Sequence, residues 1–205
     1  MKTQIITFIT ALTLGAGTVT TQASPVKNEN AIVLTGITAI NKIEVLGNVT
    51  LYVSDGAKDQ VKVYNKYYSE RALVQSSNGV LRITSYKAEK LVVWVTAADL
   101  RAISAYDNAE VKSFGNLSKI EFDVDLHNNA TAKLNIEAFS ANVTVTDHAK
   151  VDMSGTVDEY ALKYNRAENV CTNDLVAKHA EKTLTPVAAN KAKKDNNDLA
   201  DLLID

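Results

Sequence analysis

Three alternating carboxylates are the most conspicuous candidates for chemistry in this 205-residue chain. Glu121, Asp123 and Asp125 would all lie on one face of a β-strand, because strand side chains alternate between faces. Such a row suits Ca²⁺ binding through oxygen atoms, or acid catalysis in a sugar-cleaving enzyme. The residues between them, Phe122 and Val124, are apolar. We therefore interpret the carboxylates as the solvent side of a half-buried strand.

The histidines and the single cysteine provide no recognisable metal or nucleophile motif. His127 and His148 lie at adjacent offsets of neighbouring repeats, but no zinc-binding spacing accompanies them, so we interpret them as surface turn residues. A cysteine nucleophile needs a nearby base, and no motif links a histidine to Cys171. Cys171 is expected to be a buried structural thiol. No catalytic residue, metal ligand, cofactor-binding residue or cofactor is predicted.

Aromatic residues offer a different kind of site, a surface on which sugar rings stack. The candidates are Trp94, Tyr64, Tyr67 and Tyr68. Trp94 stands between two valines, so in a strand it faces away from them and toward the outer surface. Aromatic residues also suit strands on packing grounds alone. A ligand-binding surface at these four residues is kept as a prediction.

Short strands are the elements that must position these side chains. From about residue 36 to residue 96, apolar and polar residues alternate in short runs. Polar turns separate the runs, for example at residues 54–56 and 77–79. Alternation with a period of two predicts half-buried strands, and no segment shows a convincing helical stripe. The chain is expected to be all-β.

An internal repeat follows these strands. A short pattern returns four times at a nearly regular spacing, with alanines at positions 109, 130, 149 and 167. A strand-containing repeat of this period predicts a parallel right-handed β-helix, or solenoid, with coils of about 20 residues. A β-sandwich of about eight short strands is the alternative. The low content of Gly (8) and Pro (2) favours the solenoid, because tight hairpins need turn residues.

One position of the repeat carries Asp or Asn each time: Asp107, Asn128, Asp147 and Asn165. These side chains bond to nearby backbone and tolerate left-handed geometry, so the position predicts a structural ladder of stacked turns. In the fourth repeat the apolar residues from Tyr160 onward are displaced by one place. A one-residue slip turns every side chain to the other face, which predicts a deletion or bulge in that coil.

The N-terminus resembles a secretory signal peptide. Lys2 precedes an apolar stretch, and small residues lead to Ala23, so cleavage after Ala23 is expected. The apolar stretch is shorter than the roughly 20 residues that span a bilayer, and no membrane span is expected after cleavage. The expected organisation is a signal peptide (1–23), one solenoid domain (24–184) and a flexible charged tail (185–205). A segment that caps the last coil is the alternative for the tail.

The charge balance argues against two classes of partner. Lys and Arg number 22, Asp and Glu number 24, and the formal net charge is -2. Proteins that bind nucleic acid or anionic membranes normally carry a basic excess or stripe. With 46% hydrophobic and 22% charged residues, the chain has the composition of an ordinary folded protein.

Several short motifs occur in a characteristic order. They are the stretches 36–40, 46–53, 61–63, 78–83 and 92–103, followed by repeats of the type Ala-x-Val near a small or Asx turn. In this order the chain resembles the head GIN domain family of auto-transporter adhesins, over about residues 32–173. The resemblance implies a β-helix-like fold, no established catalytic residues, and an extracytoplasmic location (periplasmic, secreted or at the cell surface) in a Gram-negative bacterium.

The sequence predicts a non-enzymatic, adhesin-like binding protein of the cell envelope, whose partner is a glycan or another protein. Extended free surfaces of repeat proteins suit binding. Two alternatives stay open. One is a small polysaccharide lyase or hydrolase on a β-helix, and the other is a structural envelope protein that self-assembles into a homo-oligomer.

Overall fold

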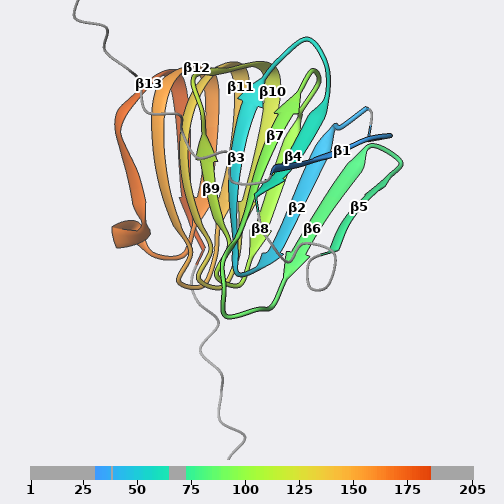
Figure 1. Ribbon diagram of the computed structural model, residues 1–205. Coiled ribbons are helices and arrows are strands. Elements are labelled where there is room, and N and C mark those ends of the chain that lie inside the picture. Colours follow the sequence, from blue (N-terminus) through green and yellow to red (C-terminus); the bar gives the residue numbers. More distant parts are fainter. Residues whose placement is uncertain (1–30, 38, 65–72, 186–205) are drawn as a thin grey trace, which may run out of the picture.

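The computed structural model describes residues 31–37, 39–64 and 73–185. Within these ranges, thirteen strands form one curled sheet, and the only helix is the short 3-10 helix η1 (Ala167–Asn169) (Figure 1). The prediction of an all-β protein is confirmed. The strands are β1 (Ala31–Leu34), β2 (Lys42–Gly47), β3 (Val49–Asp55), β4 (Gln60–Tyr64), β5 (Leu73–Ser77), β6 (Val80–Ser85), β7 (Leu91–Ala97), β8 (Ala102–Tyr106), β9 (Glu110–Ser113), β10 (Leu117–Leu126), β11 (Thr131–Val145), β12 (Lys150–Tyr164) and β13 (Val170–Leu184).

Some expected segments lie outside the described residues. They are the signal peptide (1–23), the first residues of the mature domain (24–30) and residues 186–205 of the tail. The expected ligand-binding residues Tyr67 and Tyr68 also lie outside them.

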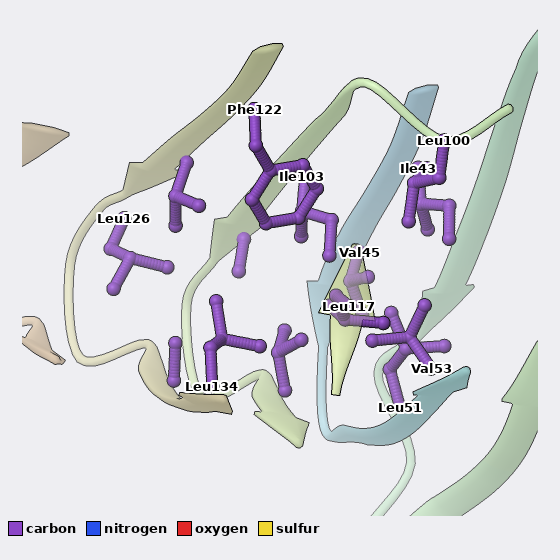
Figure 2. Close-up of a cluster of buried hydrophobic side chains, with 14 of the residues drawn as sticks. Ile43, Val45, Leu51, Val53, Leu100, Ile103, Leu117, Phe122, Leu126 and Leu134 are labelled. Carbon is purple, nitrogen blue, oxygen red and sulfur yellow. The ribbon is translucent and has the colours of Figure 1, made fainter. Parts of the chain in front are cut away.

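The inner face of the curled sheet carries the core. Along β7, Leu91, Val93 and Val95 are buried, whereas the residues between them are half-buried on the outer face. This alternation follows directly from the strand geometry, which points successive side chains to opposite faces. Figure 2 shows part of the core, in which the ring of Phe122 lies among aliphatic side chains. One continuous apolar cluster therefore packs against the inner face along the described sheet.

Strand pairing in the N-terminal half differs from that of a regular parallel β-helix. Three pairs are antiparallel, namely β1 with β4, β4 with β7, and β5 with β6. The other pairs, including β2 with β6 and β3 with β7, are parallel. A single curled sheet of mixed pairing does not clearly match the expected solenoid. It also differs from the β-sandwich alternative, which needs two sheets packed face to face.

The C-terminal half contains three long strands in parallel register. β11, β12 and β13 have 15 residues each, and β12 lies between the other two. Val145 pairs with Leu126 on one side and with Tyr164 on the other, so its two partners lie one repeat before it and one repeat after it in the sequence. Figure 1 shows β13 at the end of the curled sheet opposite β5.

The turns before β9, β11 and β12 are joined by side-chain hydrogen bonds. Asp107, Asn128 and Asp147 have positive φ angles of 60°, 58° and 58°. The Asp107 amide donates to Oδ1 of Asn128 at 3.2 Å, and the Asn128 amide donates to Oδ2 of Asp147 at 2.9 Å. The side chains of Asn128 and Asp147 thus each accept a hydrogen bond from a backbone N–H group of the preceding turn. All three residues have the left-handed backbone conformation, which Asp and Asn tolerate.

Asn165 departs from the expected fourth position of this ladder. Its amide donates to the carbonyl of Val145, just as the amide of Thr146 donates to that of Leu126. Asn165 therefore corresponds to Thr146, one place before Asp147, and it is not among the described residues with positive φ. The reason is that the strand stays in register through this repeat, so the irregularity falls in the turn around η1. A bulge does occur, between β12 and β13 at residues 152–154.

Candidate ligand-binding surface

Four aromatic side chains meet on the outer face of the sheet, and we call Tyr52, Tyr64, Trp94 and Phe114 the aromatic cluster. Trp94 on β7 pairs in register with Tyr52 on β3, and the two rings stack with centroids 4.8 Å apart. Phe114 lies 5.1 Å from Trp94, and Tyr64 on β4 lies 6.3 Å from it in an edge-on arrangement. Such distances are typical of favourable aromatic pairs.

Phe114 is the most exposed ring of the aromatic cluster. It is 62% exposed, whereas Tyr52, Tyr64 and Trp94 are half-buried. Its amide donates to the carbonyl of Val53 at 2.7 Å, which fixes the residues after β9 against β3. The Trp94 ring is thus supported by its neighbours, while Phe114 presents apolar surface to solvent.

The structure brings together two of the four aromatic residues expected from the sequence, Trp94 and Tyr64. Sequence reasoning missed Tyr52 and Phe114. Tyr52 had the same signal as Trp94, since it also stands between two apolar residues of an alternating run. Phe114 had none, because it follows the short strand β9 and approaches Trp94 only through the pairing of β9 with β3.

A groove of about 390 Å³, lined by both apolar and polar residues, borders the aromatic cluster on the same face. The two meet at Lys112, which lines the groove, pairs in register with Tyr52 and holds its Nζ 5.9 Å from the centre of the Tyr52 ring. Such a cation over an aromatic ring is favourable. The polar lining of the groove comprises Glu110, Lys112, Thr131, Lys133, Lys150, Asp152, Glu168, Asn169 and Cys171.

Ion pairs neutralise much of the charge along this groove. Glu110 lies 2.7 Å from Lys112 and 3.1 Å from Lys90, and Lys133 lies 2.9 Å from Asp152. The hydrogen bond from Lys112, together with those from Lys90 and Thr50, lowers the pKa of Glu110 to about 2 against the opposing effect of burial. Glu110 therefore stays ionised across the physiological pH range.

We expect Glu110 to make stability depend on acid pH. Its pKa is lower in the folded chain than the usual 4.5, so its contribution is fully present above that value and is lost as the pH falls toward 2. Between about pH 5 and pH 2, the wild type should lose about 1 kcal/mol more than Glu110→Gln, since solvent screens a side chain that is 27% exposed. Urea unfolding across this pH range measures the difference, and parallel curves for the two proteins would contradict it.

A family model described as putative auto-transporter adhesin, head GIN domain, matches residues 39–189. The chain belongs to this family. The resemblance found in the sequence is thereby confirmed. The family description names an adhesin and no enzymatic activity, and it indicates an extracellular or surface location. No curated protein matches the chain significantly.

Solved structures resemble this head GIN domain in fold. A putative adhesin from Bacteroides fragilis is 18% identical, with a TM-score of 0.68 and coverage of 78% of each chain. A putative adhesin from Parabacteroides distasonis is 15% identical, covers 76% of this chain and 78% of its own, and has a TM-score of 0.59. Another protein of that species, described as a putative lipid binding protein, is 11% identical with the same coverage and a TM-score of 0.52. At these identities the likeness concerns the fold alone.

The carboxylate row of this head GIN domain lies on the outer face of β10. Glu121 and Asp123 are exposed and Asp125 is half-buried, while Phe122 and Val124 are buried on the other face. Asp123 accepts a hydrogen bond from the Asn142 side chain at 2.9 Å. In the described ranges, no group of three His, Cys, Asp or Glu side chains is placed to hold a metal ion. None of the helical structure described there is long and apolar enough to cross a membrane.

His127 and His148 lie in the turns before β11 and β12. The His127 ring stacks on Tyr106, with centroids 4.8 Å apart and planes 4° apart. Its Nδ1 lies 2.9 Å from the hydroxyl of Thr146. His127 therefore packs between neighbouring turns.

The expectation of a buried cysteine is wrong, because Cys171 is exposed. Cys171 on β13 pairs in register with Asp152 on β12, whereas its neighbour Val170 pairs with the buried Val151. The register therefore assigns Val170 to the inner face and Cys171 to the outer one. The hydrophobicity of cysteine alone could not reveal that Cys171 lies on the outer face, since the face of each residue depends on where its strand begins.

Proposed function

We propose that this head GIN domain is a non-enzymatic, adhesin-like binding protein that contacts a glycan through the aromatic cluster. The observation that supports the proposal is the gathering of four aromatic rings on one outer face, with an exposed phenyl ring at Phe114. Apolar faces of sugar rings pack on aromatic side chains, and nearby polar groups provide orientation. Polar residues in the lining of the groove next to the cluster, such as Lys112 and Thr131, supply such groups.

The proposal includes the finer architecture and the route to the envelope. Residues 102–184 wind as successive right-handed parallel coils, which is supported by partners one repeat apart along β10, β11 and β12. The segment 1–23 directs export and is removed after Ala23, as its charge and apolar pattern indicate. The mature protein then acts in the periplasm, at the surface or outside a Gram-negative cell.

Self-assembly is a second candidate function, favoured by the open edge of the sheet at β13. Among the described residues, β13 pairs only with β12, so the other side of a 15-residue strand carries unpaired backbone groups. Such an edge is a template for strand addition. Its side chains include the exposed Val176. Light scattering of the purified mature chain would show whether this edge forms oligomers.

We expect Trp94→Ala and Phe114→Ala each to weaken glycan binding at least about fivefold, since each removes an aromatic contact. The mature chain (24–205) is first screened on a glycan array, and the affinity for any bound glycan is then measured by calorimetry. Tyr86→Ala is the matched control, because Tyr86 is an exposed aromatic residue outside the cluster. Equal binding by all variants, or no binding by the wild type, would contradict the proposal.

A further inference from the structure

The open edge of β13 carries an apolar segment in the middle of the strand. Ala177 pairs in register with the buried Val157, so Ala177 and Leu175 point to the inner face and are half-buried there. Val176 lies between them on the outer face and is 66% exposed. A strand added along this edge would cover the three residues and satisfy the backbone groups beside them.

The last part of β13 is protected against such an addition. Lys182 pairs in register with the buried Leu162, which places Lys182 on the inner face. Its Nζ donates a hydrogen bond to the hydroxyl of Thr172, at 3.2 Å. Inward-pointing charges are one of the means by which edge strands resist pairing. Strand addition is therefore favoured before Lys182, around Val176.

The apolar segment is complementary to itself. In an antiparallel pair the residues directly opposite each other point to the same face of the sheet. Around a two-fold axis at Val176, this valine meets the same valine of a second copy on the outer face. Leu175 meets Ala177 of the second copy on the inner face. The exposed valines and the inner apolar residues thus cover each other.

The charges that flank this segment match in the same register. Asp174 and Lys178 each lie two residues from Val176, on the outer face, and both are exposed. The two-fold axis therefore sets Asp174 of each copy opposite Lys178 of the other. Lys178 also lies 2.7 Å from Asp158 of its own chain, which holds its side chain at this edge. Opposite charges directly across an antiparallel pair are favourable.

We infer that β13 pairs antiparallel with β13 of a second copy, about a two-fold axis at Val176. This inference rests on self-assembly, the second candidate function given above, and it specifies the partner and the register. A two-fold interface uses the same surface on both copies, so it closes after two chains and yields a dimer rather than a fibre. The outer face with the aromatic cluster then continues from one copy to the other.

Sedimentation equilibrium of the mature chain (24–205) tests the dimer. Val176→Lys should raise its dissociation constant at least about tenfold, because the two introduced charges face each other at the axis. Val33→Lys is the matched control, since Val33 is an exposed valine on the strand β1 at another edge of the sheet. Circular dichroism checks that both variants remain folded.

Charge reversal tests the register. Asp174→Lys and Lys178→Asp should each weaken self-association, because like charges then face each other on both sides of the axis. An equimolar mixture of the two variants should dimerise again, since every lysine at these positions then faces an aspartate. Failure of the mixture to dimerise, with a wild-type dimer, would overturn the register.

Cys171 allows a distance measurement, because it is the only cysteine of the chain and is exposed on β13. The bulge takes up one residue between 171 and 174, so each Cys171 lies about four strand positions from the axis. Electron-electron resonance between nitroxide labels on the two copies should give about 25–30 Å, at roughly 3.3 Å per position. A distance outside this range would contradict pairing at Val176.

Two further outcomes distinguish the inference from the function on which it rests. Oligomers that persist unchanged in Val176→Lys would leave self-assembly in place and overturn the β13 interface. A wild type that stays monomeric at all concentrations would overturn both. Neither outcome affects the glycan proposal, which the array and the Trp94→Ala variant test separately.

Discussion

Phe122→Ala is expected to lower the free energy of unfolding by about 3–5 kcal/mol. Phe122 on β10 is fully buried and is among the largest side chains of the core (Figure 2). Truncation removes its apolar surface from the core and leaves a cavity, because packed neighbours relax only in part. Urea or guanidinium unfolding, followed by circular dichroism, measures the loss.

Phe139→Ala is the matched control for this prediction. Phe139 lies on the neighbouring strand β11 but is 59% exposed, so the same substitution should lower the free energy of unfolding by only about 0.5 kcal/mol. A similar loss in both variants would mean that Phe139 is also packed, either within the chain or against another copy. A small loss in both would contradict the core assigned to the inner face.

Gly155→Ala is expected to lower the free energy of unfolding by about 2–6 kcal/mol. Gly155 on β12 has a φ of +104°, and a Cβ atom at this position would lie 2.0 Å from the carbonyl oxygen of Ile136. Ile136 is its partner in register on β11, so the clash involves the backbone of the sheet itself. The strands would have to separate locally, and thermal or chemical unfolding would record the loss.

Gly115→Ala separates the steric clash from backbone strain. Gly115 also has a positive φ, +84°, but no atom lies within 4 Å of an added Cβ. Gly115→Ala should therefore lower the free energy of unfolding only by the cost of holding alanine in a left-handed conformation, which is about 1–2 kcal/mol. Equal losses of stability in the two variants would show that the close approach of Gly155 to Ile136 does not contribute to the effect of Gly155→Ala.

The distribution of side chains between the two faces of β7 was determined by the sequence itself. Val93 and Val95 were expected on the face opposite Trp94, and the structure buries both valines and leaves Trp94 half-buried on the outer face. This succeeds because face selection is local, since strand geometry sends each side chain to the side opposite its neighbour. The all-β class and the family followed from the same local patterns and their order.

The choice of strand partners was decided only by the tertiary structure. Tyr52 and Phe114 join Trp94 because β3, β7 and β9 lie side by side, although β4, β5 and β6 come between Tyr52 and Trp94 in the sequence. The antiparallel pairs of β4 are decided in the same way. Alternation fixes the face of a residue but not the strand beside it. Pairing depends on backbone hydrogen bonds and core packing between distant segments, so the aromatic cluster exists only once these strands have paired.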